Sequence, residues 1–522
     1  TLPDLAGLTV KDARIAYQGL TIDHLNLEIG HLGEKLVVPV KFSLELAPKA
    51  GATALPLSGD FDVTPDSASR QFRFASLELR GRWSPSHDGA TVDWDLSAPG
   101  AALDLAAETL NVAAFTAHVA DARLSGRVAV AGLVSGPSAS GDVRLDPLAP
   151  RELFDHLGMS LPRTRDAKAL DRVSATAAFV YGHDSMRLSG IDLRVDDSHL
   201  SGSASIDDIK TRAASFDLSL DHLDADRYLD PDPGSANAAA AGGSPSSHSL
   251  RSLHLRGKLA VGHLRIDGIA LDRVRVGIVA NLGVVQVAPL AAELYGGSTS
   301  GTVTLDDRGA VPALAIRQSI QNIDVAAFLA DFAKTRRLSG RGNVNLDLTA
   351  HGRGTDALLR SLDGRVDANL NGGAIEGIDL WGDVNRAVTA FQQRNPLVAA
   401  GGGGGRTRFD AFRASATLEN GVASSRDLLI SSQNLRVTGT GTTNLVTRAI
   451  DYQLQASVSR TPAAPGSVLL TVPVAVTGTL TDPKVSPDLG GIAKQRMRQE
   501  LDQRKNELKK KLEDKLKDLF GH

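Results

Sequence analysis

The sequence predicts a mainly β protein, built as an elongated, curved antiparallel sheet with a groove-like face, short connecting helices and a C-terminal amphipathic α-helix. Apolar and polar residues alternate with a period of two in many segments, such as residues 344–348, as expected for half-buried strands. Turn-forming residues separate these segments at short intervals, for example at 371–373 and 420–421. Apolar residues make up 42% of the 522 residues but aromatic ones only 4%, so the core must be aliphatic.

One face of the predicted strands is apolar and the other is polar. This favours antiparallel pairing, because parallel sheets usually bury both faces. We expect the apolar faces to line a groove, although the same faces could instead close on each other as the core of a sandwich. The candidate lining residues are Val344, Leu346, Leu348, Val366, Leu370, Ile450, Tyr452, Leu454, Val468, Leu470, Val472, Val474 and Val476.

Composition divides the chain into six segments. These are a first β-region (1–229), a flexible linker rich in Pro, Gly, Ala and Ser (230–249), a central β-region with helices (250–395), a Gly-rich loop (396–408), a C-terminal β-region (409–486) and a charged amphipathic helix (487–522). Short helical patterns occur at 151–157, 324–332, 355–362 and 380–393. The glycine run at 401–405 is followed by Arg-Thr rather than Lys-Ser or Lys-Thr, which argues against a phosphate-binding loop.

The C-terminal segment has apolar residues at mostly three- and four-residue steps and an excess of lysine. This spacing predicts an amphipathic helix with a narrow apolar face. The helix could dock on its own domain or a partner, or it could contact anionic lipid headgroups. The residues of the apolar face are Met497, Leu501, Leu508, Leu512, Leu516, Leu519 and Phe520.

Several kinds of chemistry find no support in the sequence. The absence of cysteine excludes disulfides, thiol catalysis and Cys-zinc sites. None of the 13 histidines lies two to four residues from another, and neither His-Glu-x-x-His nor Gly-x-Ser-x-Gly occurs. We therefore predict no catalytic residue, no metal and no cofactor. A formal net charge of −3 leaves no electrostatic footprint for nucleic acid.

Other β architectures make distinguishable predictions. A structural β-solenoid would show a stricter short repeat than this sequence has. An outer-membrane barrel would need two aromatic girdles, which five Tyr and three Trp cannot supply. An enzyme on a β-scaffold, acting on polysaccharide, would need a cluster of carboxylates on one face.

One phrase, a strand followed by a turn and a second strand that begins near a glycine, occurs three times. It spans residues 188–206, 290–306 and 428–445, and the glycine suggests a bulge or a close approach of two backbones. These phrases resemble the AsmA family. Three further segments share the resemblance, namely the connector between strands at 223–229, residues 338–380 and the C-terminal β-segment at 478–485. The resemblance covers nearly the whole chain and is stronger after about residue 180.

This resemblance implies a fold similar to that of repeating-β-groove lipid-transfer proteins. It implies a non-enzymatic role in outer-membrane biogenesis, in membrane protein targeting and in shielding phospholipid acyl chains, in the periplasm of a Gram-negative bacterium. Family members carry an N-terminal inner-membrane helix, so a chain that starts at Thr1 is expected to be the C-terminal majority of a longer protein. The implied partners are phospholipid, the inner membrane through that helix, and the inner leaflet or assembly machinery of the outer membrane. The alternative is a passive structural scaffold of the envelope without lipid transport.

Overall fold

The protein is described by a computed structural model with two compact units. Unit 1 comprises Thr1–Asp267 and Asp272–Gly283, and unit 2 comprises Gly268–Leu271 and Val284–His522. The described residues are 4–17, 20–47, 55–83, 91–157, 159, 161, 163–229, 250–332, 334–377, 379, 382, 386, 405–433, 435–459, 468–487, 505 and 509.

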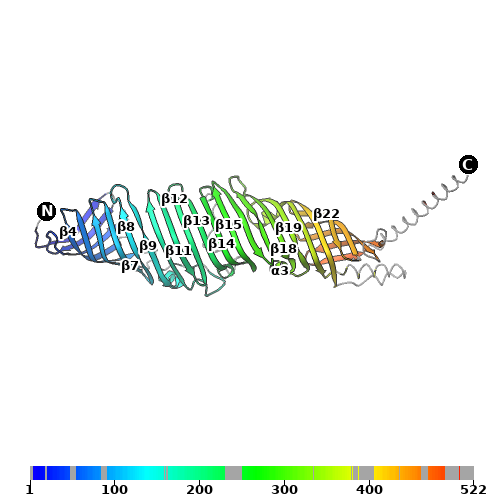
Figure 1. Ribbon diagram of the computed structural model, residues 1–522, viewed down its shortest axis with the longest axis horizontal. Helices are drawn as coiled ribbons and strands as arrows, with labels where there is room; N and C mark the ends of the chain where they lie inside the picture. Colours follow the sequence, from blue (N-terminus) through cyan, green and yellow to red (C-terminus); the bar gives the residue numbers. More distant parts are fainter. Residues whose placement is uncertain are drawn as a thin grey trace. The chain divides into compact units, whose positions relative to one another are not determined.

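Unit 1 is a meander in which each strand pairs with the next along the chain (Figure 1). Strands β1 to β13 form consecutive antiparallel pairs, which agrees with the predicted fold class. The elements are β1 (Leu8–Tyr17), β2 (Leu20–Ile29), β3 (Val38–Ala47), β4 (Leu55–Asp66), β5 (Gln71–Trp83), β6 (Val92–Asp104), β7 (Thr109–Val119), β8 (Ala122–Ala131), β9 (Ser138–Leu148), α1 (Pro150–His156), β10 (Val173–Gly182), β11 (Ser185–Val195), β12 (Ser198–Asp208), β13 (Ala213–Asp224), η1 (Ala225–Arg227) and β14 (His254–Ile266).

One pair in unit 1 departs from this pattern. Strands β13 and β14 are parallel, with Ala213 opposite His254 and Asp224 opposite Arg265. The chain must therefore return to the starting end of β13 before β14 begins, and a parallel pair always requires such a long connection. The predicted linker at 230–249 lies in this connection and falls outside the described residues. The alternation of residues cannot reveal the change, because it is the same for both kinds of pairing.

Unit 2 continues with the same kind of meander. Strands β16 to β26 form consecutive antiparallel pairs, while β15 (Ile269–Asn281) is divided between the two units. The elements are β16 (Val284–Leu294), β17 (Gly297–Asp306), β18 (Ala313–Asp324), α3 (Val325–Phe332), β19 (Leu338–His351), α4 (Thr355–Arg360), β20 (Asp363–Glu376), β21 (Arg406–Glu419), β22 (Val422–Ser431), β23 (Leu435–Asn444), β24 (Ala449–Ser459), β25 (Val468–Thr479) and β26 (Pro483–Pro487).

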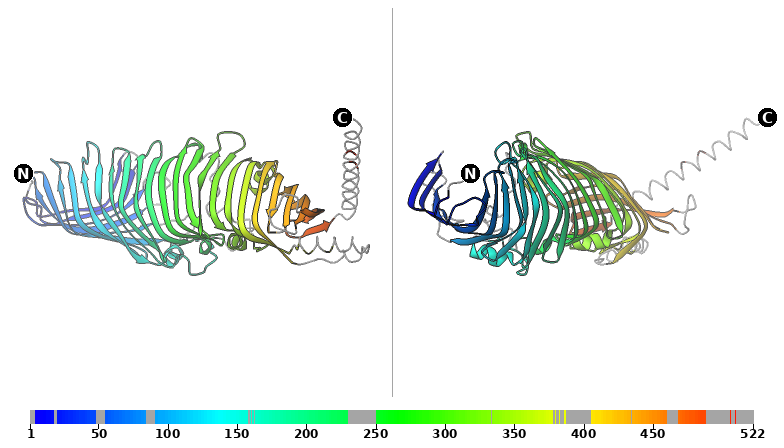
Figure 2. Two further views of the ribbon diagram at one scale, coloured as in Figure 1. Left: turned by 45° about the vertical axis from the view of Figure 1, so that its right-hand side comes forward. Right: turned by 60° about the vertical axis from the view of Figure 1, so that its left-hand side comes forward.

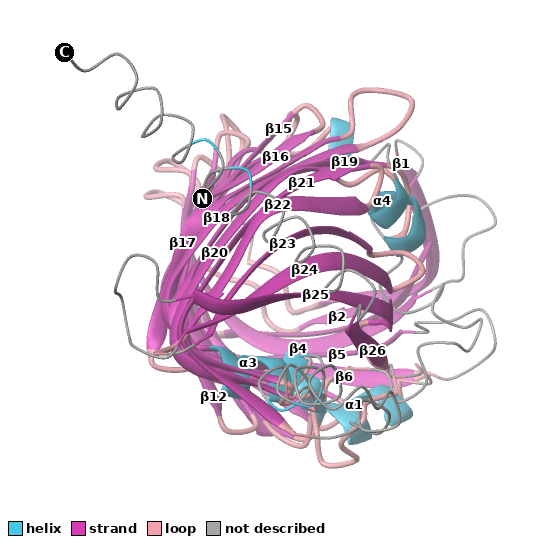
Figure 3. Cartoon of the chain, turned by 90° about the vertical axis from the view of Figure 1, so that its right-hand side faces the viewer, coloured by secondary structure: helices cyan, strands magenta, loops and turns pink. Residues whose placement is uncertain are grey.

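The helices of the described part are short, as predicted. Helix α3 lies before β19 and α4 lies after it, so the two helices mark opposite ends of the strands of unit 2 (Figure 3). We refer to these ends as the α3 end and the α4 end. The helix predicted at 380–393 falls outside the described residues apart from Gly382 and Arg386. The C-terminal helix predicted at 487–522 falls outside them apart from Pro487, Lys505 and Lys509.

The strands of both units are curved (Figure 2), and bulges interrupt their pairing. In unit 2, β16 carries an extra residue between Val287 and Leu290, and Leu290 pairs with Gly301. In unit 1, β11 carries one between Leu188 and Ile191, and Ile191 pairs with Gly202. A bulge leaves one residue unpaired and increases the local bend and twist of the strand.

The repeated phrase is explained by these bulges. A Cβ atom on Gly301 would lie 2.0 Å from the carbonyl oxygen of Arg317, and one on Gly202 would lie 2.1 Å from that of Asp217. Both distances are far below van der Waals contact, so only glycine fits where the neighbouring backbone comes this close. The interpretation of these glycines as sites of close backbone approach beside a bulge is confirmed.

Unit 2 contains a cluster of buried hydrophobic side chains that forms its core. The side chains of Val437, Ala456 and Val472 are 0% exposed. The buried cluster consists of Leu294, Ile323, Val325, Leu370, Phe409, Ile430, Leu435, Val437, Leu454, Ala456, Val472, Val474 and Val476. Because Val325 begins α3, this helix contributes to the same core as the strands.

Candidate apolar binding site

Strand pairing brings the predicted apolar residues onto a single face of unit 2. Residues directly opposite each other in antiparallel strands share a face of the sheet. Tyr452 lies opposite Val476, and Leu454 lies opposite Val474. On strands farther back in the sequence, Leu346 lies opposite Val366. Residues from distant parts of the sequence therefore form one apolar surface.

A cavity of about 360 Å³ lies on this surface. Its volume falls within the range of ~300–1,000 Å³ that is typical of ligand pockets. Of the predicted lining residues, the cavity brings together Val366, Tyr452, Leu454 and Val476. The described residues that line it are Val366, Ala368, Ile375, Phe412, Ala414, Ser415, Ala416, Ser425, Leu428, Ile430, Tyr452, Leu454 and Val476.

Small residues create the room for this cavity. Ala368 of β20 lies directly opposite Ala414 of β21, and two such short side chains leave space above the sheet. On the next strands, a Cβ atom on Gly441 would lie 2.4 Å from the ring of Tyr452. The absence of that atom lets the ring lie against the sheet instead of standing up into the cavity. Gly439 has the same relation to Leu454, also at 2.4 Å.

The other predicted lining residues occupy different positions. Leu370, Val472 and Val474 belong to the packed cluster, and Ile450 is half-buried against it. The side chains of residues 344, 346 and 348 are half-buried on the same face but do not line the cavity. Val468 and Leu470 belong to β25, but their side chains fall outside the described part of the chain.

The most important residues that the sequence interpretation missed are on β21 and β22. Phe412, Ala414 and Ala416 alternate with Arg413 and Ser415, so the signal is present in the sequence. It was weak because alanine marks an apolar face less clearly than Val or Leu does. Leu428 and Ile430 on β22 show the same alternation over a shorter stretch.

The described residues of the cavity lining are neutral, and their polar side-chain groups are hydroxyls. The hydroxyl groups of Tyr452 and Thr443 are hydrogen-bonded over 3.1 Å. Ser425 is buried, and its hydroxyl lies 3.4 Å from a carboxylate oxygen of Asp427. Ser415 donates to Asp427 from its hydroxyl at 2.7 Å and from its backbone N–H at 2.8 Å. These hydrogen bonds from Ser415 hold the pKa of Asp427 below its usual value.

The opposite face of the same strands is polar. Asn343, Asn345 and Asp347 of β19 are exposed and alternate with the half-buried apolar residues of that strand. On β20 and β21, Asp367, Asn369 and Arg413 are also exposed. These strands therefore have one polar face exposed to water and one apolar face.

The described residues contain no group of three or more His, Asp or Glu side chains placed to hold a metal ion. Within the same residues, no helix is both long and apolar enough to cross a bilayer. The aliphatic walls of the cavity and its few hydroxyls are suited to holding an apolar group.

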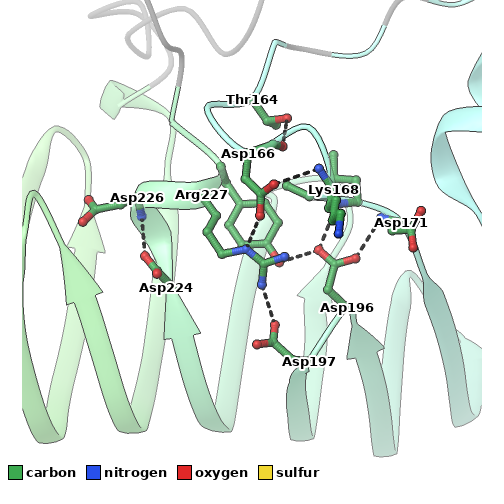
Figure 4. Close-up of polar contacts among 12 residues, drawn as sticks. Thr164, Asp166, Lys168, Asp171, Asp196, Asp197, Asp224, Asp226 and Arg227 are labelled. Atoms are coloured by element: carbon green, nitrogen blue, oxygen red, sulfur yellow. Dashed lines mark hydrogen bonds and ion pairs between the residues drawn. The ribbon is translucent and has the colours of Figure 1, made fainter.

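The predicted connector at 223–229 is the centre of a polar network in unit 1 (Figure 4). Arg227 donates through Nε to Asp166 at 2.8 Å and through Nη1 to Asp197 at 2.9 Å. The hydroxyl of Tyr228 donates to Asp196 at 2.7 Å. The connector therefore ties the segment after α1 to the turn between β11 and β12.

Asp196 also accepts hydrogen bonds from three consecutive backbone N–H groups, those of residues 170–172, over 2.8–3.1 Å. Burial raises the pKa of Asp196, but the hydrogen bonds from Tyr228 and from these backbone groups outweigh it and leave the pKa lowered. Burial and the bond to Asp196 raise the pKa of Tyr228. Asp196 and Tyr228 are hydrogen-bonded within the network, so we interpret it as a structural anchor that holds these segments together.

Comparison with known proteins agrees with the repeated phrases and the meander. Residues 143–428 match the model of the AsmA family. Over 305 residues, the chain is 23% identical to Protein AsmA of Escherichia coli (strain K12), an alignment that covers 55% of this chain and 49% of that protein. The chain thus spans about half the length of this curated relative. Because the family match extends over more than half of its residues, this chain belongs to the AsmA family.

Proposed function

We propose that this protein shelters phospholipid acyl chains along the apolar face of unit 2, and that it serves outer-membrane assembly in this way without catalysing a reaction. The observation that carries the proposal is the neutral cavity of about 360 Å³ on that face. Its walls are aliphatic and aromatic, and they come from strands β20, β21, β22, β24 and β25.

The energetics favour an apolar guest. Burial of each methylene group contributes ~0.8 kcal/mol, so exposing a sixteen-carbon tail to water costs on the order of 10 kcal/mol. A protein surface that replaces water around the tail removes much of this cost. Aliphatic side chains impose few directional requirements, so such a surface accepts chains without forming specific bonds.

Family membership supports the cellular setting of the proposal. We infer a periplasmic location, with attachment to the inner membrane through a segment that precedes the residues present here. The partners would be phospholipid and the inner leaflet or assembly machinery of the outer membrane. The amphipathic residues of the segment 487–522 would contact such a membrane or a partner protein. The protein would also influence the targeting of proteins to the membrane.

A matched pair of variants on β20 tests the proposal. Val366 lines the cavity, whereas Asn369 is exposed on the opposite face of the same strand. Each of the substitutions Val366→Asp and Asn369→Asp adds one negative charge. Native mass spectrometry of the purified chain should detect co-purified phospholipid in the wild type and in Asn369→Asp, and little or none in Val366→Asp. Wild-type lipid levels in Val366→Asp would show that this face does not hold lipid.

The packed cluster favours a second candidate function, that of a passive structural or interaction scaffold of the envelope. In that case the aliphatic residues serve only as a core, and neither the wild type nor either variant should carry lipid above the level of an unrelated periplasmic protein.

A further inference from the structure

Building on the proposed lipid function, we propose that the cavity of unit 2 is a blind seat for one acyl chain. The chain would enter from the α4 end, and its methyl terminus would rest against the packed cluster at the α3 end. The cavity would thus retain the end of a chain and would not let it slide through.

The position of the packed cluster supports a closed α3 end. Val437, Ala456 and Val472 lie toward the α3 end of β23, β24 and β25, and all three are fully buried. Toward the α4 end, the lining residues Val366 and Tyr452 are half-buried, whereas Ser425 and Val476 are buried. A guest therefore meets close-packed side chains at the α3 end, and the accessible space toward the α4 end lies beside β20 and β24.

The volume limits the seat to one chain. A methylene group occupies nearly the same space as a molecule of liquid water, about 30 Å³. The cavity of about 360 Å³ then holds on the order of a dozen methylene groups. This is most of one acyl chain, and two chains side by side would exceed it.

The hydroxyl pair of Tyr452 and Thr443 indicates the orientation of the chain. Both residues lie near the α4 end of their strands, and their oxygens are 3.1 Å apart. One hydrogen atom forms the bond between them, so the second hydroxyl hydrogen can be donated to another acceptor. An ester or carboxylate oxygen at the head of the chain would be such an acceptor. The polar end would thus lie beside Tyr452 and the methyl end beside Ile430.

A series of saturated fatty acids tests the seat on the whole chain. Affinity for octanoate through stearate would be measured by calorimetric titration. Each added methylene should increase affinity by up to about fourfold until the seat is full, near dodecanoate, and longer chains should then bind no more tightly. A steady increase through stearate would overturn the blind seat, and so would a wild type that carries phospholipid but binds none of these acids.

A larger side chain on the strands beneath the cavity should change the plateau, which is the chain length at which affinity stops increasing. Ala414→Leu should shift it to acids shorter by two or more carbons, whereas Arg413→Leu, on the exposed opposite face, should leave it unchanged. If Ala414→Leu does not fold, Ala416→Val replaces it. Tyr452→Phe should weaken the binding of dodecanoate severalfold without moving the plateau.

These results separate the two proposals. An unchanged plateau in the folded Ala414→Leu or Ala416→Val variant, with fatty acids still bound, would overturn the seat and leave lipid sheltering intact. A wild type that carries no phospholipid and binds no fatty acid would overturn both.

Discussion

Units 1 and 2 share the same meander but differ in the chemistry of their hollows. Unit 1 has a hollow of about 1410 Å³, whose lining includes Glu78, Arg80, Asp93, Asp95 and His118. The cavity of unit 2 is about a quarter of that volume, and none of the described residues that line it is charged. Size alone would favour unit 1 as the binding site, whereas chemistry favours unit 2.

Several polar side chains of the hollow in unit 1 pair with each other and remain accessible to water. Arg82 Nε lies 2.7 Å from Asp93, and His118 Nδ1 lies 3.0 Å from Asp95. Withdrawing such groups from water to cover an acyl chain would cost several kcal/mol. The comparison teaches that a meander supplies a curved surface, and that the side chains on each face decide what this surface can hold.

The largest effect expected from this comparison is the response to a new charge. Val472→Asp places a carboxylate at a fully buried position in unit 2 and should lower the free energy of unfolding by about 3–5 kcal/mol. Ser58→Asp, in the exposed lining of the hollow in unit 1, should change it by less than about 0.5 kcal/mol. Urea unfolding measures both, and equal effects would contradict the difference between the units.

A smaller, pH-dependent effect is expected at the anchor in unit 1. The pKa of Asp196 is lowered in the folded protein, so its ionised form contributes stability above its unfolded pKa of about 3.9. That contribution is lost as the pH falls through the folded pKa. Asp196→Asn should therefore lower the melting temperature at pH 7 and should have progressively less effect in acid. Calorimetry across this range tests the prediction, and a difference that stays constant with pH would argue against a role for the charge.

The smallest effect is expected from an exposed side-chain contact in unit 1. Both side chains of the pair formed by His118 and Asp95 are more than 40% exposed. Such pairs contribute little because water screens them. His118→Ala should change the free energy of unfolding by less than about 1 kcal/mol and should leave the co-purified lipid unchanged. A marked loss of lipid would show that the hollow of unit 1 takes part in binding.

Parts of the site could be predicted from sequence and parts could not. Alternation placed Tyr452, Leu454 and Val476 on apolar faces of their strands, and the structure brings all three to one cavity. Alternation also marked Val472, which is packed in the core and does not line the cavity, whereas Val476 belongs to the core and also lines the cavity. The two valines look the same in sequence because their environment is set by what lies across the sheet.

The linker and the C-terminal helix were predicted from composition and spacing. Most of these residues fall outside the described part of the chain, so both remain predictions. The helices predicted at 151–157, 324–332 and 355–362 and the bulge glycines were predicted correctly, because each depends on local backbone constraints. The turn predicted at 371–373 is wrong, because these residues lie within β20, and the helix predicted at 380–393 falls largely outside the described residues. The parallel pairing of β13 with β14 was not predicted, since it depends on how the chain returns after a long connection.

The sequence by itself determined the strands, their apolar and polar faces, the positions of glycine and the membership of the AsmA family. These features follow from periodicity and from local steric limits. Only the tertiary structure decided which aliphatic residues pack and which surround empty space. That outcome depends on the register between strands, which sets Ala368 beside Ala414 and Gly441 beside Tyr452. Register is a relation between distant segments, and it is settled when they pair.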